Sequence, residues 1–174
     1  GTSTFIKIQI SEYRFLIVNL MSIKNRYFFY IIYKSFFKML SKKTKYGIKA
    51  LSFLARQEDQ TPVQIAEIAK SENISIKFLE SILLLLRYSG FLGAKKGKGG
   101  GYYLIKDPKE INMADVYRIL EGPIALLPCV SHNFYEKCDD CTDEAACAVR
   151  RLMTEIRDNT LQILENNSLA DIIF

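Results

Sequence analysis

The stretch from residue 91 to residue 105 constrains the fold of this chain more than any other feature. Two short apolar runs, Phe91-Leu92 and Tyr102-Tyr103-Leu104-Ile105, flank a turn that is rich in glycine and lysine. This pattern predicts a β-hairpin, because glycine allows the tight backbone turn and apolar residues line the two strands. The lysines of the turn have two interpretations: they neutralise the phosphates of a nucleic acid, or they only form a solvated face.

Three helices are predicted ahead of this hairpin. Residues 44–56 carry an apolar stripe at helical spacing. Thr61 is the expected N-cap of a second helix, 62–70, which has a proline at its first position. The third helix spans about 75–88, and Gly90 is expected to end it. Two short helices with a tight turn, followed by a basic hairpin, are typical of a winged helix-turn-helix, so the predicted fold class is mainly α with a small β-hairpin wing.

Charge is divided unevenly along the chain. Residues 39–106 contain twelve Lys and Arg against five acidic residues, whereas residues 107–174 contain six against thirteen. A polyanion would therefore be attracted to the middle and repelled by the C-terminal part. The glycine-rich turn lacks the G-x-x-x-x-G-K-[ST] pattern of a nucleotide loop, and a strand follows it rather than a helix. The combined pattern favours DNA binding.

Several short motifs carry a resemblance to a known family. They are Leu40-Ser41, Tyr46-Gly47-Ile48-Lys49-Ala50-Leu51, Ile65-Ala66, Ile74-Ser75-Ile76-Lys77-Phe78-Leu79-Glu80, Leu86-Arg87, Gly90, Lys96-Gly97 through Gly101-Tyr102, and Glu121-Gly122-Pro123. With these motifs, residues 39–165 resemble the Rrf-two family of bacterial winged-helix transcription regulators. Members of that family include an iron–sulfur cluster regulator and a nitric-oxide-sensitive repressor.

The resemblance implies a homodimer that binds a near-palindromic operator in double-stranded DNA. It also implies which residues meet the DNA: Ser75, Lys77, Phe78 and Glu80 in the major groove, and Lys95, Lys96, Gly97 and Lys98 of the wing in the minor groove. Lysine offers a point charge without the planar fork of arginine. We therefore expect the wing to respond to groove width and phosphates rather than to a base code.

All four cysteines of the chain lie within 19 residues, with the spacing C-x8-C-x2-C-x5-C. They are Cys129, Cys138, Cys141 and Cys147. Such clustering in a chain that is not rich in cysteine indicates a metal or cluster site, or a redox switch, before structural disulfides. Thiolates suit both iron–sulfur clusters and zinc. The acidic residues around them are expected to raise the thiol pKa values.

The resemblance implies that this loop senses iron–sulfur, redox or nitric-oxide status through an iron–sulfur cluster of the [2Fe–2S] type, with the four cysteines as ligands. Sensing members of the family usually have three cysteines there. Their fourth ligand is a histidine at the position of Arg150, or an acid at the position of Lys45, so neither carries over. The fourth thiol replaces it, or His132 assists; His132 as a plain surface residue is the alternative. Structural zinc, bare thiols that form disulfides, and no role at all stay open.

Two further helices are predicted in the C-terminal part. The first spans 112–120 with Asn112 as its N-cap. The second runs from Asp143 to about Asn166, where apolar residues recur at helical spacing. It would span roughly 36 Å, too long for so small a body to cover. We expect it to form a homodimer, with packing on its own domain as the alternative. Ligand loss or oxidation in the cysteine loop is then expected to change the angle between the two DNA-reading heads.

The expected domain organisation has four parts. They are an N-terminal extension (1–38), a winged helix-turn-helix (39–122), a cysteine-containing sensor loop (123–147), and a dimerisation helix with its tail (148–174). Met39 is the expected native start, and a genuine flexible or partner-binding arm is the alternative. No run of 18 uncharged apolar residues occurs, so we expect no membrane span and a cytoplasmic location. With one histidine and no phosphate loop, we expect no enzyme; an interaction protein with a zinc-stapled loop is the remaining competitor.

Overall fold

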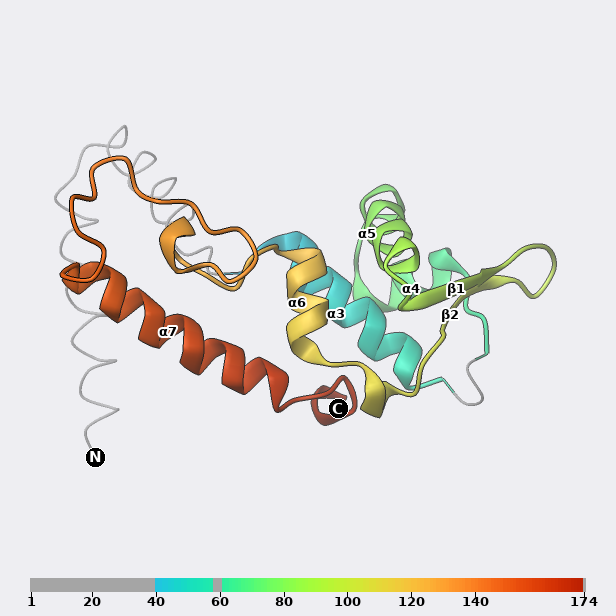
Figure 1. Cartoon of the computed structure of the whole chain (residues 1–174). Coiled ribbons are helices and arrows are strands. Elements are labelled where there is room, and N and C mark those ends of the chain that lie inside the picture. The colour runs from blue at the N-terminus through green and yellow to red at the C-terminus, as the bar shows by residue number, and fades with distance from the viewer. Residues whose placement is uncertain (1–39, 58–60, 174) are drawn as a thin grey trace, which may run out of the picture. The chain divides into compact units, whose positions relative to one another are not determined.

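The computed structural model describes residues 40–57 and 61–173. The predicted N-terminal extension (1–38) and the expected native start at Met39 both lie outside these residues. Figure 1 shows the elements along the chain. They are α3 (Lys42–Ala55), α4 (Ile65–Glu72), α5 (Ile76–Tyr88), β1 (Leu92–Lys95), β2 (Gly101–Leu104), α6 (Met113–Leu120) and α7 (Ala148–Glu165), with short 3-10 turns between them. The two strands pair with each other in one antiparallel sheet. The predicted fold class, mainly α with a small β-hairpin, is confirmed.

Helix α3 begins at Lys42, two residues before the expected start. Ser41 is its N-cap, and the hydroxyl of Ser41 accepts a hydrogen bond from the backbone N–H of Thr44 at 3.1 Å. Glu121, at the end of α6, accepts a second bond from the N–H of Ser41 at 3.1 Å and a third from the hydroxyl of Thr44. A carboxylate at a helix N-terminus also complements the helix dipole. The end of α6 therefore helps to cap α3.

Helix α4 begins at Ile65, so the prediction of a start at Thr61 and Pro62 is wrong. The reason is a long-range pairing with β2. The N–H of Val63 donates to the carbonyl of Tyr102 at 2.9 Å, and the N–H of Tyr102 donates back to Val63 at 2.8 Å. This bridge keeps Val63 in extended backbone, and the helix can start only after Gln64. The tertiary contact with Tyr102 therefore overrides the local N-cap signal of Thr61 and Pro62.

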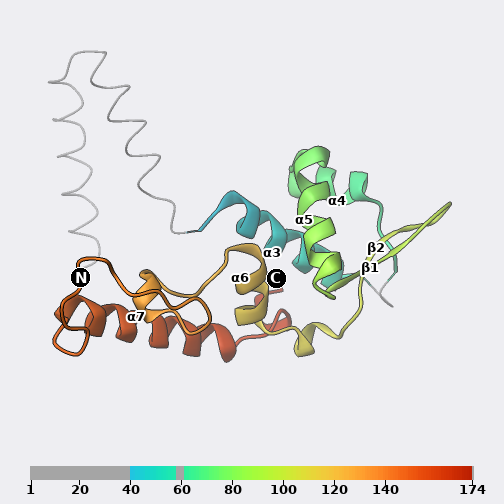
Figure 2. The ribbon, with the colours of Figure 1, turned by 45° about the horizontal axis from the view of Figure 1, so that its top comes forward.

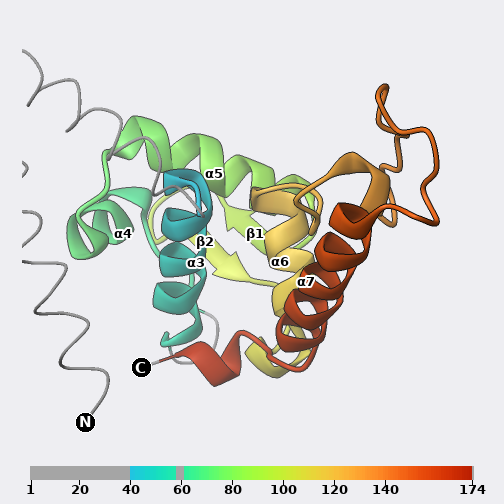
Figure 3. The same cartoon turned by 90° about the vertical axis from the view of Figure 1, so that its left-hand side faces the viewer.

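Helix α5 is the centre of the hydrophobic core. Four of its side chains have no exposed surface: Leu79, Ile82, Leu83 and Leu86. Figure 3 shows α3, α5 and α6 gathered around the base of the hairpin, and α3, α5 and α6 contact one another. The contact between α3 and α6 is close, because a Cβ atom at Gly47 would lie 2.5 Å from Leu120. Helix α5 ends as predicted, with Gly90 in the left-handed region at φ +80°.

The hairpin is tied to the body through the Val63–Tyr102 bridge on β2, and its tip is free of such contacts within the described residues. Gly97 and Gly99 turn the chain at the tip with φ values of +90° and +73°, which other residues adopt only with strain. At the tip-side end of β2, a Cβ atom at Gly101 would lie 2.1 Å from the carbonyl oxygen of Val63. Only glycine therefore lets β2 approach the segment before α4 closely enough to form the bridge described above.

The chain after α7 returns to the body. Asn112 caps α6 as predicted, since its side-chain oxygen accepts from the N–H of Ala114 at 2.9 Å. The amide nitrogen of Asn112 donates to the carbonyl of Glu165, the last residue of α7, at 2.8 Å. The N–H of Leu169 donates to the carbonyl of Ile111 at 2.8 Å, and the Leu169 side chain is fully buried. These bonds anchor the C-terminal end of α7.

Helix α7 begins at Ala148, so the expected start at Asp143 is wrong. The carboxylate of Asp143 accepts from the N–H of Ala145 at 2.9 Å and forms a local turn instead. Cys147 is the N-cap of the helix. With 18 residues, α7 is about 27 Å long rather than about 36 Å, and none of its residues is buried. Within residues 40–57 and 61–173, no helix has the length and apolar character needed to cross a bilayer.

Candidate DNA-binding surface and cysteine pocket

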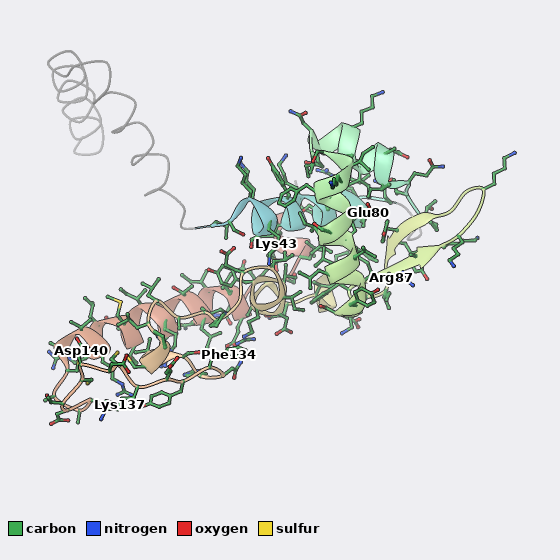
Figure 4. All side chains as sticks on the ribbon, turned by 90° about the horizontal axis from the view of Figure 1, so that it is seen from above. Lys43, Glu80, Arg87, Phe134, Lys137 and Asp140 are labelled. Carbon is green, nitrogen blue, oxygen red and sulfur yellow. The ribbon has the colours of Figure 1, made fainter. Side chains whose placement is uncertain are left out.

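The predicted recognition helix, α5, follows α4 after three residues. Asn73 reverses the chain with φ +53°, a conformation that asparagine tolerates better than most residues. Ser75 is the N-cap of α5, but its side chain makes no capping hydrogen bond, so its hydroxyl is free of that role. Ser75, Lys77 and Glu80 are exposed, and Figure 4 shows Glu80 and Arg87 along α5.

Phe78 differs from the other three predicted major-groove residues. Its side chain is half-buried and packs against the core. The ring lies edge-on to the ring of Tyr46 in α3, with 5.8 Å between the centroids and an interplanar angle of 77°. Edge-to-face pairs of this kind are favourable. The structure thus places Phe78 in a contact between α5 and α3, while the other three side chains face outward.

The wing, defined as residues 92–104, carries its charge at the tip. Lys95, Lys96 and Lys98 are all exposed, and so is Gly97 between them. Figures 1 and 2 show the hairpin projecting away from the helices. A narrow, basic projection of this kind can approach a polyanion without a clash from the helical body.

The predictions for α5 omit Ile76. It is the first residue of the helix, and 51% of its surface is exposed. Its spacing from Glu80 is one helical turn, so the two lie on one side of the helix. Spacing alone did not give this signal, because position 76 lies three and seven residues before the buried Leu79 and Leu83 and so shares their helical stripe.

The four cysteines come together around one pocket of about 520 Å³. Cys129 is buried in the 3-10 turn Pro128–Val130, and Cys147 is the N-cap of α7. Cys138 and Cys141 are half-exposed and lie in the loop between these two elements. All four are free thiols. Residues 18 positions apart in the sequence thus line a single cavity at one end of α7.

Within the pocket, Cys138 lies beside Cys129, and Cys141 lies near Cys147. Hydrogen bonding with Cys129, followed by burial and nearby negative charge, raises the pKa of Cys138. Burial, followed by the charge of Cys147 and of acidic neighbours, raises the pKa of Cys141. Asp140 acts on both thiols, in the direction expected from the sequence. Both shifts favour the neutral thiol over the thiolate.

Two arginines of α7 hold the segment that carries Cys129. The Nε atom of Arg150 donates to the carbonyl of Cys129 at 3.4 Å and lies 3.7 Å from Glu144. Arg150 also lines the pocket, so its charge lies beside the thiols. Arg157, about two turns further along, donates from Nη1 to the carbonyl of Val130 at 2.5 Å. The pocket and α7 are thus connected by hydrogen bonds as well as by the chain.

The donor chemistry of the pocket fits a thiolate-bound metal or cluster. The side-chain positions, however, form neighbouring thiols rather than a closed site. Across the part of the chain that the structure describes, no group of three or more His, Cys, Asp or Glu side chains is placed so that it could hold a metal ion. Ligation by all four thiols therefore requires the loop to close around the group.

His132 lies elsewhere. It lines a separate cavity of about 270 Å³ together with Arg118, Phe134 and Arg157, and it is not among the residues that line the cysteine pocket. The idea that His132 assists the thiols therefore has no support in this arrangement.

Comparison with known proteins places the whole described region in one family. The family model described as "Rrf2: Iron-dependent Transcriptional regulator" matches residues 40–174. An rrf2-like HTH-type transcriptional regulator of Rhodobacter capsulatus is 39% identical over 138 residues, which cover 78% of this chain and 92% of that protein. The HTH-type transcriptional regulator IscR of Photorhabdus laumondii is 27% identical over 134 residues, which cover 77% and 78%.

A solved structure agrees with these matches. The structure of CymR, described as the global cysteine regulator of Bacillus subtilis, superposes with a TM-score of 0.64 at 30% identity and covers 77% of this chain and 95% of CymR. The matched region includes the helix-turn-helix, the wing and the cysteine pocket. The chain belongs to the Rrf2 family, whose members are DNA-binding transcription regulators and not enzymes.

Proposed function

We propose that this regulator acts as a homodimer on a near-palindromic operator, and that its cysteine loop (residues 123–147) holds an iron–sulfur cluster of the [2Fe–2S] type. Through the cluster it senses iron–sulfur, redox or nitric-oxide status. DNA binding and transcription regulation follow from family membership. The observation that carries the finer proposal is that all four cysteines line one pocket at the start of α7.

The proposed DNA contacts are the exposed Ser75, Lys77 and Glu80 of α5 and the exposed tip of the wing. The tip contributes Lys95, Lys96, Gly97 and Lys98. The first residues of a recognition helix are those that approach base edges in a major groove. The wing lysines neutralise phosphates, so affinity should fall steeply as the salt concentration rises.

The proposed dimer interface is the outer stripe of α7. Four apolar side chains spaced for one helix face are more than a third exposed: Val149, Leu152, Ile156 and Ile163. Such a stripe on one helix is costly to leave in water. Pairing with the same stripe of a second copy buries both and produces the two-fold symmetry that a near-palindromic operator requires.

The proposed cluster ligands are Cys129, Cys138, Cys141 and Cys147. When bound, the cluster supplies a redox-active group that oxidants and nitric oxide attack. The chain contributes a buried anchor in Cys129 and a positive charge in Arg150, which offsets the negative charge of thiolates in the pocket. The N–H of Arg150 already donates to the sulfur of Cys147 at 3.4 Å. The description of the family as iron-dependent supports iron as the metal.

The pocket is joined to both functional parts of the molecule. Cys147 is the N-cap of α7, and Glu121, directly before the loop, caps α3 of the body. A change in the loop therefore acts on the start of the proposed dimerisation helix and on the end of α6. Sensing requires two such states with different affinity for DNA.

The decisive experiment begins with anaerobic purification of the full chain, followed by iron, sulfide and zinc analysis and an absorption spectrum. A [2Fe–2S] site predicts about two irons and two sulfides per chain. The double variant Cys141→Ser/Cys147→Ser should lose both, whereas Thr142→Ala, which removes a hydroxyl from the same pocket, should keep them. The Kd for an operator selected from a random duplex pool is then measured before and after exposure to air and nitric oxide.

Four results would contradict parts of this proposal. Zinc alone would replace the cluster by a structural metal. Metal-free protein with titratable thiols would favour a bare-thiol redox loop, which the neighbouring placement of Cys129 and Cys138 also favours. An operator Kd that stays the same in every redox state would exclude sensing by the loop, and a lack of DNA binding would exclude the proposed contacts.

A further inference from the structure

Helix α5 presents an apolar side chain among its proposed polar DNA contacts. Ile76 is the first residue of the helix and stands between Ser75 and Lys77, one turn before Glu80. Its side chain is 51% exposed, whereas Phe78, the other apolar residue of this turn, packs against Tyr46. Ile76 is therefore the apolar group that the first turn of α5 offers to a molecule outside the body.

Ile76 does not serve the structure of the helix start. An apolar residue before the N-cap often packs on the fourth helical residue and fixes the entry of the chain. Here those positions are Ile74 and Leu79, which are 6% and 0% exposed and belong to one core cluster. The helix start is thus already stabilised without Ile76, and a small polar residue at position 76 would cost the fold little.

We infer that Ile76 contacts the C5-methyl group of a thymine in the major groove, and so makes thymine a specified base in each half of the operator. This inference rests on the proposed DNA contacts of α5. An isoleucine has no hydrogen-bond donor for a phosphate or for a polar base edge. Thymine is the base that offers an apolar group in the major groove, and small apolar side chains recognise it there.

The charges nearby favour a base edge over the DNA backbone as the partner of Ile76. Glu80, one turn along, is repelled by phosphates, while its carboxylate can accept a hydrogen bond from a base amino group. Lys77 follows Ile76 directly and offsets that negative charge. The backbone contacts are better supplied by the wing lysines, which carry no neighbouring carboxylate in their own segment, residues 95–101. The first turn of α5 is therefore suited to base edges.

The test removes the methyl group from the DNA and not only the side chain from the protein. The full chain first selects its preferred duplex from a random pool. Each thymine is then replaced by deoxyuridine, in both half-sites at once, which deletes the C5-methyl group and leaves the base pair intact. Kd values are measured by fluorescence anisotropy for the wild type, Ile76→Ala, Ile76→Val and the control Ile105→Ala. Ile105 is similarly exposed but follows β2 at the end away from the wing tip.

One thymine position of the half-site should matter. Replacing that thymine by deoxyuridine should weaken wild-type binding about four-fold for each methyl group lost, and so about fifteen-fold when both half-sites carry the replacement. Ile76→Val and Ile105→Ala should keep this difference. Ile76→Ala should bind the thymine duplex more weakly and show no difference between the two duplexes.

The outcomes distinguish a failure of the proposed DNA contacts from a failure of the role given to Ile76. If the wild type binds no selected duplex, the proposed DNA contacts fail and this inference fails with them. If it binds the thymine and deoxyuridine duplexes equally at every position, the contacts stand and the role of Ile76 is overturned. A thymine preference that survives intact in Ile76→Ala, with unchanged circular dichroism, overturns it as well.

Discussion

The body formed by residues 40–122 and the C-terminal part formed by residues 123–173 bury their side chains very differently. In the body, α5 alone has four side chains with no exposed surface. In the C-terminal part, the 18 residues of α7 include none that is buried, and the buried residues of the whole part are Cys129, Val130, Ser131 and Leu169. The body therefore carries its own core, while the C-terminal part leaves much of its apolar surface exposed, as at Val149, Leu152 and Ile163.

This difference is the one that the proposed function requires, a well-packed DNA-binding unit beside a loosely packed sensor part. A segment with few packed side chains changes conformation at low free-energy cost, whereas a core rearranges only with the loss of many contacts. Events in the cysteine pocket can therefore alter the C-terminal part without disturbing the geometry of α5 and the wing. Four predictions test this division, from the largest expected effect to the smallest.

Leu120→Ala should lower the stability of the body. Leu120 is fully buried and fills the space that Gly47 leaves open in α3. We expect a loss of about 2–5 kcal/mol in the free energy of unfolding, because a large core side chain leaves a cavity. Urea unfolding at fixed protein concentration measures it. The control Leu126→Ala, at a residue that is 65% exposed in the cysteine loop, should change stability by less than about 0.5 kcal/mol; equal effects would remove the distinction between the two parts.

Leu152→Asp should weaken the proposed dimer and leave the fold of the protomer intact. Leu152 is 52% exposed on the outer stripe of α7. A carboxylate buried between two stripes should weaken the dimer by about 3 kcal/mol, roughly a hundred-fold in its dissociation constant. Sedimentation velocity measures the dimer, and circular dichroism checks the helices. Gln162→Asp adds the same charge away from the stripe and should leave the dimer intact. A dimer unaffected by Leu152→Asp would place the interface elsewhere.

Gly101→Ala tests the tie between the wing and the body. Its Cβ atom would lie 2.1 Å from the carbonyl oxygen of Val63. We expect a loss of about 1–3 kcal/mol in stability, since the backbone bridge must open to make room. Gly99→Asn is the matched control, because asparagine tolerates the left-handed conformation and nothing lies near that position. Hydrogen exchange at the N–H groups of Val63 and Tyr102 reports the bridge, and protection unchanged in Gly101→Ala would contradict this account.

Glu121→Gln tests the junction of the two parts. Burial acts to raise the pKa of Glu121, but hydrogen bonds from Thr44 and Ser41, together with the charge of Lys43, lower it below the ordinary value of 4.5. Because the folded-state pKa is the lower one, the carboxylate stabilises the fold above pH 4.5, and this contribution is lost as the pH falls through the folded-state pKa. We expect the variant to lose about 0.5–1 kcal/mol at pH 7, since the group is largely exposed.

The pH dependence supplies the check on that assignment. The stability difference between wild type and Glu121→Gln, measured by urea unfolding, should shrink steadily below pH 4.5. Glu110→Gln, at an exposed acid of the turn before α6, should show a smaller difference at pH 7. A Glu121 effect that persists undiminished at pH 3 would mean that the charge is not its cause.

The sequence predicted most of the body and less of the C-terminal part, for a physical reason. Where a boundary depends on local chemistry, as with Asn112 capping α6 or Gly90 after α5, the prediction agrees with the structure. The start of α4 failed because Tyr102, far along the chain, holds Val63 in extended backbone. The start of α7 failed because Asp143 forms its own turn. No local sequence pattern reveals the pairing of Val63 with Tyr102. The start of α7 depends on whether Asp143 caps a helix or forms its own turn, and the sequence allows both.

The site was predictable to a similar degree. The sequence placed the four cysteines in one short loop, and in the structure they line one pocket, while their role as metal ligands stays a prediction. The same clustering did not reveal that Cys129 is buried while the other three are half-exposed. On α5, the family resemblance gave Phe78 as a major-groove residue and did not include Ile76, whereas the structure packs Phe78 against Tyr46 and leaves Ile76 exposed. The geometry of the helix face, rather than the residue type, decides such cases.

The bridge between Val63 and Tyr102 has a consequence for protein engineering. The bridge holds β2 at Tyr102, one residue from the tip-side strand pair of Lys95 with Gly101. Gly100 must remain glycine, because a Cβ atom there would clash with the Lys95 carbonyl. Residues 96–99 are left as a cassette whose ends are held at a fixed separation by the body. Wing tips from other members of the family can be grafted between these ends, which offers a route to exchange the proposed minor-groove contacts while the recognition helix stays untouched.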